Sequence, residues 1–502
     1  MSEQPKRGSI GVSTAIGAAW VVSWRLLSRL LGVISIVILS RLLSPDTFGV
    51  VAIATSLIGA LDAFSVIGWQ DAVIRSHHYR KDLLNAAFTI SAARGVLMAI
   101  VIAAAAPFAG EFFSDDRLVP ILYLLAGLTA LEGLENVGPV EFRRNLAFER
   151  EFVQFAIPRF LAFVVTIYFA YSLRDHWALV LGIVAGRLAK FAASYLMHPF
   201  RPRFSATAIR EILGFSLWTW AASMAIFVKE RTPAFVIGRT MNADAVGRFT
   251  LGQEIAMLPI TEVVYPVSRA LFSGMASAHR DGRELGDAFC RAVGVLSVLI
   301  LPLAIGISSV AHFVVAIALG ATWRDVTPLI QLLGIAAPFS ILTTICGTCL
   351  ISVARLRGNF AINAVAAAFV VVLVVVLVTA YGLVGAISAV CIVMTCEGLL
   401  ATGLTLHWLG GNASDLLAQA WRPVVAVATM AIVLGASGYG WPAQAATAST
   451  TLADLVVAVL LGAATYVLAL ALLWQLSGRP QGPERWLLSL LVRALDARRG
   501  VS

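Results

Sequence analysis

The feature that most constrains this chain is a succession of apolar runs, each long enough to cross a lipid bilayer. A transmembrane helix needs about 20 mostly apolar residues. The 502-residue sequence is 59% hydrophobic and only 13% charged, whereas soluble domains carry about 25% charged residues. We therefore predict an all-α polytopic membrane protein with about fourteen spans, at residues 13–40, 48–69, 83–109, 118–139, 152–171, 177–197, 211–238, 247–268, 287–318, 327–353, 359–380, 383–409, 422–440 and 452–476.

The basic residues between these spans predict the orientation of the chain. Lys and Arg are concentrated in alternate connections, such as 75–81, 142–150 and 200–204, whereas 110–116 on the opposite side is acidic. Positive connections stay in the cytoplasm, so we predict cytoplasmic amino and carboxyl termini. The same bias accounts for the net charge of +9, so this charge does not indicate a nucleic-acid partner. The first residues lack the pattern of a cleaved signal peptide.

One short segment occurs twice. Arg41 to Gly49 reads RLLSPDTFG, and Arg239 to Gly247, 198 positions further along, reads RTMNADAVG. Six predicted spans separate the copies, so the two halves would be parallel repeats. The expected organisation is a cytoplasmic tail at 1–12, an amino-terminal lobe at 13–200, a cytoplasmic linker at 201–208, a carboxyl-terminal lobe at 209–409, two further spans at 422–476 and a basic cytoplasmic tail at 477–502.

Charged residues inside spans are costly and usually face a cavity or one another. Arg25 and Arg29 are four positions apart, so they share a helix face, which Gly32 continues; Arg94 lies in the third span. We predict that these three arginines bind an anionic headgroup such as pyrophosphate. In the alternative, Arg25 extends to the membrane surface and Asp62 neutralises Arg29 or Arg94. Surface positions are expected for Arg159, Arg187 and Lys190.

The second half carries its own buried charges. Lys229, Glu230 and Arg231 are consecutive and cannot share one face, so we expect a local ion pair and one charge directed into a cavity. Candidates for ion coupling or charge pairing are Asp62, Glu230, Glu254, Glu262 and Glu397. Glu132 and Glu135 are expected to pair with Arg143 or Arg144.

The sequence gives no sign of an enzyme, a metal site or a cofactor. It contains no nucleotide-binding GxxxxGK[ST] segment and no HExxH. Cys346 and Cys349 form a CxxC spacing inside an apolar run, without a neighbouring histidine or a second pair, and are expected to be packing residues.

Four segments together carry a family resemblance. The turn at 41–49, the second turn with its flanks at 237–249, the span exit VVYPVSRALFSGMA at 263–276 and VEFRRNLAFEREF at 140–152 resemble the polysaccharide transport branch of the MOP flippase superfamily. The chain is most similar to its Wzx-type and colanic-acid-type exporters. Relatives commonly carry an acidic residue where this chain has Pro233, so Glu230 would replace it or the coupling differs.

The resemblance implies two six-helix lobes in a V around a central cavity, and a flippase that moves undecaprenyl-pyrophosphate-linked oligosaccharide repeat units outward by alternating access. Such units serve the synthesis of exopolysaccharide, capsule or O-antigen. Transport would be coupled to a proton or sodium gradient, with Arg25 and Arg29 at the pyrophosphate. The expected partners of this monomer are the lipid-linked substrate, the bilayer, a polysaccharide polymerase and a chain-length regulator.

Two alternatives remain open. One is a lipid II or multidrug exporter of the same superfamily. The other, from a different class, is a membrane glycan polymerase or ligase, although the longest connections on the outer side are only about ten residues. If the two lobes differ in task, the repeated turn would be their hinge, centred on Gly49 and Gly247.

Overall fold

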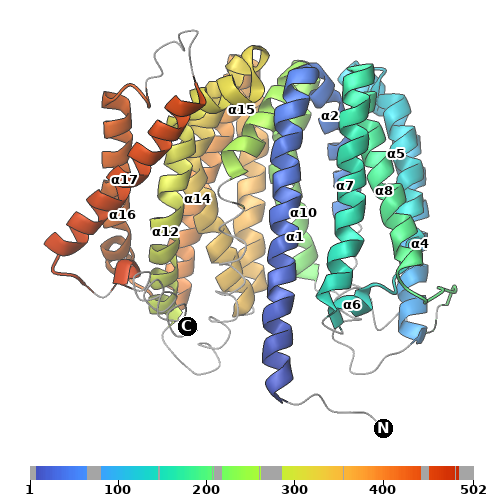
Figure 1. Cartoon of the computed structure of the whole chain (residues 1–502), viewed down its shortest axis with the longest axis horizontal. Coiled ribbons are helices and arrows are strands. Elements are labelled where there is room, and N and C mark those ends of the chain that lie inside the picture. The colour runs from blue at the N-terminus through green and yellow to red at the C-terminus, as the bar shows by residue number, and fades with distance from the viewer. Residues whose placement is uncertain are drawn as a thin grey trace. The chain divides into compact units, whose positions relative to one another are not determined.

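The protein is built from helices that follow the apolar runs. The structure, a computed structural model, describes residues 7–64, 81–144, 147–205, 207, 217–258, 261, 285–353, 355–441, 451–480 and 482–485, and these residues contain no strand (Figure 1). The helices are α1 (Arg7–Leu42), α2 (Pro45–Phe64), α4 (Lys81–Phe113), α5 (Leu118–Gly133), α6 (Val140–Arg144), α7 (Phe148–Leu173), α8 (Trp177–Leu196), α10 (Leu217–Thr240), a helix at 243–258, α12 (Leu285–Ser309), α13 (Ala311–Val314), a π-helix at Val315–Leu319, a 3-10 helix at Ala321–Val326, α14 (Thr327–Ser352), α15 (Leu356–Leu409), α16 (Ala413–Ala436) and α17 (Leu452–Leu476).

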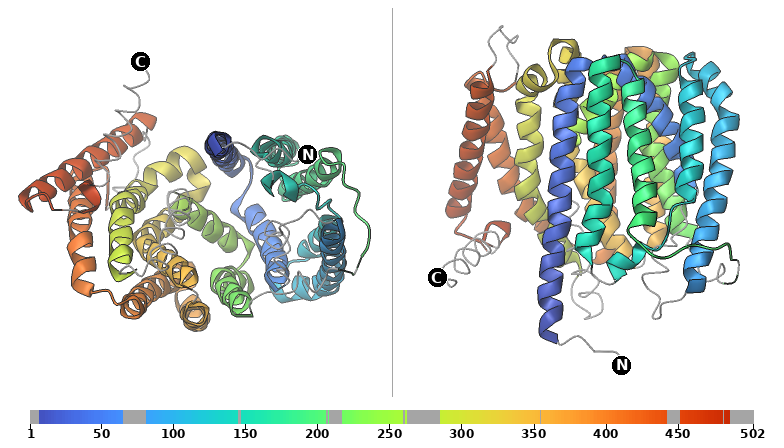
Figure 2. Two further views of the ribbon diagram at one scale, coloured as in Figure 1. Left: turned by 90° about the horizontal axis from the view of Figure 1, so that it is seen from below. Right: turned by 45° about the vertical axis from the view of Figure 1, so that its right-hand side comes forward.

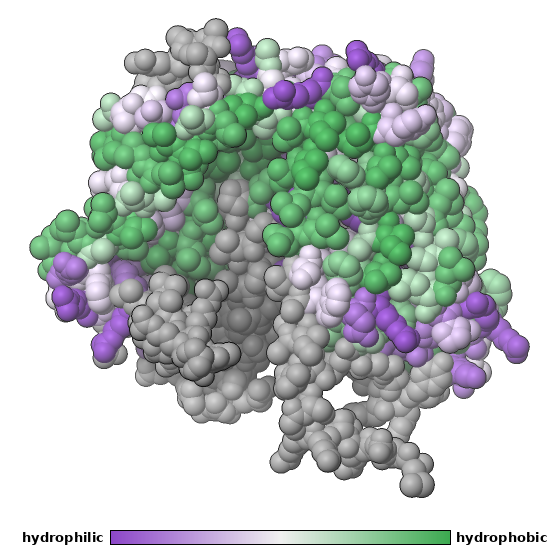
Figure 3. All heavy atoms as spheres, in the orientation of Figure 1, coloured by the Kyte–Doolittle hydropathy of each residue, from purple (hydrophilic) through white to green (hydrophobic). Residues whose placement is uncertain are grey.

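The lengths and the surface of these helices suit a lipid bilayer. Eight helical segments of the described residues are long and apolar enough to span a membrane, and the shorter apolar helices Pro45–Ala60 and Leu118–Gly133 accompany them. On the face in Figure 3, apolar residues cover the middle height of the helices, and hydrophilic residues gather toward their ends. The fold is that of a multi-pass membrane protein, as predicted; the total of fourteen spans stays a prediction.

The structure adjusts several predicted span limits. The span predicted at 452–476 coincides with α17, whereas α16 begins at Ala413, before the predicted start at residue 422. The predicted break between residues 380 and 383 lies inside α15, where Gly382 adopts φ 56° and ψ −135°. Residues with a side chain rarely adopt this conformation, so glycine divides the 54 residues of α15 into two arms. The predicted span 287–318 is shorter, because α12 ends at Ser309.

The chain forms two compact units. Unit 1 contains Met1–Trp220 and Met241–Gly247, and unit 2 contains Ala221–Thr240 and Arg248–Ser502. In unit 1, α4 packs against α5, α7 packs against α8, and α1 lies beside α7 (Figure 2). The second copy of the repeated turn therefore belongs to the same unit as the first.

Glycines allow the helix pairs of unit 1 to approach closely. A Cβ atom added at Gly95 of α4 would lie 2.7 Å from the Cα atom of Gly133 on α5, too close for any real side chain. In the second pair, a methyl group at Gly182 of α8 would overlap the hydroxyl of Thr166 on α7. Close backbone approach at small residues is a common way for membrane helices to associate.

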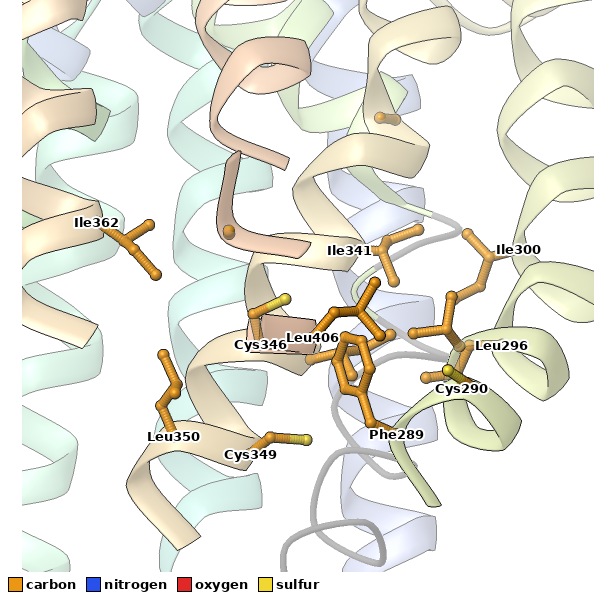
Figure 4. Packing of buried hydrophobic residues seen from close by; sticks show 14 of the residues in the cluster. Phe289, Cys290, Leu296, Ile300, Ile341, Cys346, Cys349, Leu350, Ile362 and Leu406 are labelled. Atoms are coloured by element: carbon orange, nitrogen blue, oxygen red, sulfur yellow. The ribbon is translucent and has the colours of Figure 1, made fainter. Parts of the chain in front are cut away.

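An apolar core of unit 2 lies between α12, α14 and α15. Phe289, Leu296, Ile341, Cys346 and Leu406 meet there (Figure 4). Cys346 and Cys349 are buried and free, so the CxxC spacing belongs to the helix packing, as predicted. A second core joins α16 and α17 to α12, where the Tyr466 hydroxyl donates a hydrogen bond to the carbonyl oxygen of Val298 at 2.8 Å.

Matching ion pairs support the sequence repeat. In unit 1, Arg117 donates two hydrogen bonds to Asp46, at 2.6 and 3.0 Å, and so links the connection before α5 to the start of α2. Hydrogen bonds with Asp46 and Asp115 raise the pKa of Arg117. In unit 2, Arg248 pairs with Asp325 at 2.7 Å and makes the corresponding link with the charges exchanged. In each unit, an ion pair thus joins the helix at the repeated turn to the segment that precedes a later helix, which is α5 in unit 1 and α14 in unit 2.

Candidate functional site

A row of arginines lies along the contact between α1 and α7. The two helices are parallel neighbours: the Trp24 ring of α1 lies 5.9 Å from the Phe155 ring, and further along α1 Gly32 faces Arg159. The Nη2 atom of Arg159 lies 3.7 Å from the position that a Cβ atom would take at Gly32. Because Arg25, Arg29 and Gly32 share one face of α1, Arg159 adds a third guanidinium to that face.

We call Arg25, Arg29 and Arg159 the arginine row. The sequence singled out the first two members and assigned Arg159 to the membrane surface; in the structure Arg159 is exposed, and its guanidinium lies beside Gly32. Its place beside Gly32 has a physical reason: a residue without a side chain leaves room for a guanidinium from the neighbouring helix. The signal was present in the sequence, since Gly32 continues the Arg25–Arg29 face. Guanidinium groups bind phosphate oxygens through paired hydrogen bonds, which suits the row to a pyrophosphate.

Arg94 lies in a different environment. It lines a cavity among α4, α5, α7 and α8 whose wall also contains Glu132, Glu135, Glu151 and Lys190. The carboxylates there make this environment less suited to an anion than the arginine row. Asp62, the alternative partner of Arg29 or Arg94, is in α2, and its side chain lies outside the described ones.

Ion pairs join the carboxyl-terminal end of α5 and the residues after it to α8. Arg187 binds Glu132 at 3.0 Å, and Lys190 binds Glu135 at 3.0 Å. Arg187 and Lys190 therefore have carboxylate partners within the helix bundle; the side chains of Arg143 and Arg144, the predicted partners of these glutamates, lie outside the described ones. The helices α5 and α8 are in contact, which brings the four side chains together.

A buried ion pair occupies the middle of unit 2. The Lys229 ammonium of α10 donates a 2.6 Å hydrogen bond to Glu397, whose side chain is 5% exposed. It also donates a 3.4 Å hydrogen bond to the amide oxygen of Asn363. Asn363 and Glu397 lie on opposite sides of the Gly382 break, so one lysine links α10 to both arms of α15. Lys229 thus bonds to a distant helix, and the predicted local ion pair within 229–231 stays a prediction for the other two residues.

The remaining candidate carboxylates are less enclosed. Glu230 on α10 and Glu254 on the helix at 243–258 are exposed, and Glu262 lies outside the described residues. Within the described part of the chain, no group of His, Cys, Asp and Glu side chains could hold a metal ion.

The two copies of the repeated turn are in direct backbone contact. A methyl group at Gly49 would overlap the carbonyl oxygen of Ala243, and a methyl group at Gly247 would overlap the carbonyl oxygen of Pro45. The contact is reciprocal, because Pro45 and Ala243, like Gly49 and Gly247, are 198 positions apart. Only glycine permits this crossing on either side. The predicted hinge glycines therefore meet at one point, although their movement stays a prediction.

Paired apolar helices with a repeated architecture and charges enclosed between them are typical of a membrane transporter. Residues 38–328 match the model of the polysaccharide biosynthesis protein family, and the chain belongs to that family. This membership agrees with the resemblance found in the sequence.

Curated relatives resemble this chain in sequence, and solved structures resemble it in fold. The succinoglycan biosynthesis transport protein ExoT of Rhizobium meliloti is 24% identical over 63% of this chain and 65% of its own length. The lipopolysaccharide biosynthesis protein WzxC of Escherichia coli is 21% identical over 71% of this chain and 73% of its own. The chain thus spans about two thirds of ExoT.

The fold matches the lipid II flippase MurJ at a TM-score of 0.73 and 11% identity, covering 91% of this chain and 99% of that one. An inward-facing multidrug resistance MATE transporter matches at 0.63 and 16% identity, covering 76% and 94%.

The reciprocal glycine contact generates a testable prediction. Replacing Gly49 or Gly247 with valine forces the two turns apart, because the added atoms overlap backbone that cannot rotate away. If the contact is the hinge, transport slows while the affinity for the headgroup stays within about twofold. Surface polysaccharide measured in a deletion strain, with pyrophosphate binding to the purified protein, checks both parts.

Gly127→Val is the matched control, because a Cβ atom at Gly127 meets nothing within 4 Å. Wild-type polysaccharide with Gly49→Val and Gly247→Val would remove the hinge function.

Proposed function

We propose that this protein is a flippase that moves lipid-pyrophosphate-linked oligosaccharides from the cytoplasmic to the outer face of the bacterial inner membrane. The observation that carries the proposal is the arginine row in a chain of the polysaccharide biosynthesis protein family. A lipid-linked glycan has a tail that is stable in the bilayer and a headgroup that is not. The pyrophosphate that joins the two is anionic, so it needs cationic side chains along its path across the membrane. Arg25 and Arg29 on α1 and Arg159 on α7 would supply such charges.

The relatives favour this function over the other candidates. ExoT and WzxC carry names that refer to polysaccharide transport or biosynthesis. The likeness to MurJ and to the MATE transporter supports the shared fold and leaves a lipid II or drug substrate with weaker support. A glycan polymerase or ligase has no support from these relatives. The polysaccharide polymerase, the chain-length regulator and the monomeric state remain part of the proposal.

We further propose that the Lys229–Glu397 pair couples transport to an ion gradient. A proton bound by Glu397, or a cation that replaces the ammonium, would break the link between α10 and the two arms of α15. The pair would then re-form when the ion leaves. Lys229 lies one helical turn before Pro233, the position at which relatives commonly carry an acidic residue. The Lys229–Glu397 pair would take over the role of that acidic residue in this chain.

The arginine row predicts the effect of removing its members. Arg25→Ala with Arg29→Ala should abolish surface polysaccharide in a strain lacking the native gene, and lipid-linked repeat units should accumulate inside. Arg159→Ala alone should lower polysaccharide roughly tenfold, as expected for one lost hydrogen bond to a charged phosphate. Quantifying polysaccharide and lipid-linked units at equal protein levels tests this.

Arg324→Ala is the control for loss of a positive charge, because Arg324 is an exposed residue of the 3-10 helix. Normal polysaccharide in the Arg25→Ala, Arg29→Ala double variant would contradict the proposed function.

The buried ion pair predicts a distinctive pattern of stability. Lys229→Met or Glu397→Leu alone leaves one buried charge unpaired and should destabilise the protein by about 3–5 kcal/mol. The double variant should regain most of that stability, while transport in membrane vesicles loses its dependence on the ion gradient. Thermal unfolding and gradient-driven uptake measure the two effects.

Arg291→Ala breaks the Asp287–Arg291 pair, which has a similar 2.7 Å distance but side chains 47% and 63% exposed. Exposed pairs contribute about 0–1 kcal/mol, so this control should stay close to wild type. Single variants as stable as wild type would show that the Lys229–Glu397 pair is not a structural link, and an unaltered gradient dependence in the double variant would exclude it from coupling.

A further inference from the structure

The cavity that contains Arg94 is a second candidate site in unit 1. It has a volume of about 350 Å³ and lies among the middle of α4, the end of α5, the beginning of α7 and α8. Small-molecule sites occupy roughly 300–1,000 Å³, so this cavity has room for a sugar ring. The crossing of Gly95 and Gly133 forms one wall.

The charges around the cavity balance one another. Glu132, Glu135 and Glu151 contribute three carboxylates to the wall; Arg94 and Lys190 are cations of the same wall, and Arg187 pairs with Glu132. The arginine row is not balanced in this way, because all three of its members are positive. A phosphate would therefore favour the row, whereas the cavity suits a ligand that is neutral and donates hydrogen bonds.

One carboxylate oxygen of the cavity has an unused hydrogen-bonding capacity. Oε2 of Glu135 binds Lys190 at 3.0 Å, but its buried Oε1 has no donor within the described residues. A buried acceptor without a donor is costly, and a sugar hydroxyl would satisfy it. Gln154 offers both a donor and an acceptor, and the Phe155 ring presents an apolar face to the C–H side of a sugar.

The surrounding segment holds this wall in place. The Asn136 side chain donates a 2.7 Å hydrogen bond to the carbonyl oxygen of Phe200, and its backbone N–H donates to the Ser194 hydroxyl at 3.1 Å. The Tyr195 hydroxyl donates to the carbonyl oxygen of Leu134 at 2.7 Å. The residues that follow α5 are thus fixed before any ligand binds.

The cavity lies beside the arginine row. Phe155 lines the cavity and contacts Trp24 of α1, and Arg159 is one helical turn further along the same face of α7. Four residues of helix correspond to about 6 Å, which is of the order of the distance from a pyrophosphate to the sugar attached to it. We propose that this cavity binds a neutral sugar ring of the oligosaccharide headgroup while the arginine row binds its pyrophosphate; the inference rests on the proposed function.

Saturation-transfer NMR on the full purified chain tests the proposal, with methyl α-glucopyranoside and methyl α-galactopyranoside as probes. At least one glycoside should receive saturation from the wild-type protein. Gln154→Leu and Glu135→Gln should each weaken that binding roughly tenfold. Gln154→Leu keeps both ion pairs of the wall and so separates ligand contact from stability. Gln475→Leu, at the exposed end of α17, should bind like wild type.

Inorganic pyrophosphate added at the same concentration should leave the glycoside signals unchanged. Displacement by pyrophosphate would overturn the proposal, as would the absence of any glycoside signal or equal signals from wild type, Gln154→Leu and Glu135→Gln. These outcomes are separate from the proposed function, because loss of polysaccharide in the arginine variants does not depend on sugar binding at the cavity.

Discussion

Close contact between helix backbones at glycine is the interaction on which the rest of this structure depends. Helices in lipid gain little from burying apolar side chains, so small residues that allow close packing hold them together. Gly95 and Gly133 join α4 to α5, and Gly49 and Gly247 join the two copies of the repeated turn. Because the contacts of the turn are reciprocal, its two copies meet through equivalent residues.

The charges of the helices fall into three arrangements. The arginine row lies along the contact of α1 and α7, the cavity of unit 1 mixes carboxylates with cations, and Lys229 with Glu397 forms one buried pair. Each arrangement suits different chemistry: phosphate oxygens, sugar hydroxyls and an exchangeable ion. A flippase for a lipid-linked glycan needs all three properties in one chain.

The sequence predicted the helical membrane fold and the family, because apolar length and charge alternation are properties of single segments. Arg25, Arg29 and Glu397 were identified as charges inside predicted spans, and their roles stay predictions. The sequence did not predict the partners of Lys229, Arg187 and Lys190, which lie 55 to 168 positions away, or the place of Arg159 beside Gly32. Spacing along one helix identifies a shared face, but not the side chain that a neighbouring helix brings to it.

The most direct test of the central claim is translocation by the purified protein in proteoliposomes that contain a polyprenyl-pyrophosphate-linked oligosaccharide labelled in its sugar. A glycosidase added outside reports which headgroups have crossed the membrane. The account predicts that the wild-type chain exposes the inner pool of headgroups, and that the Arg25→Ala, Arg29→Ala double variant does not. Equal rates of exposure with wild type, double variant and empty liposomes would contradict it.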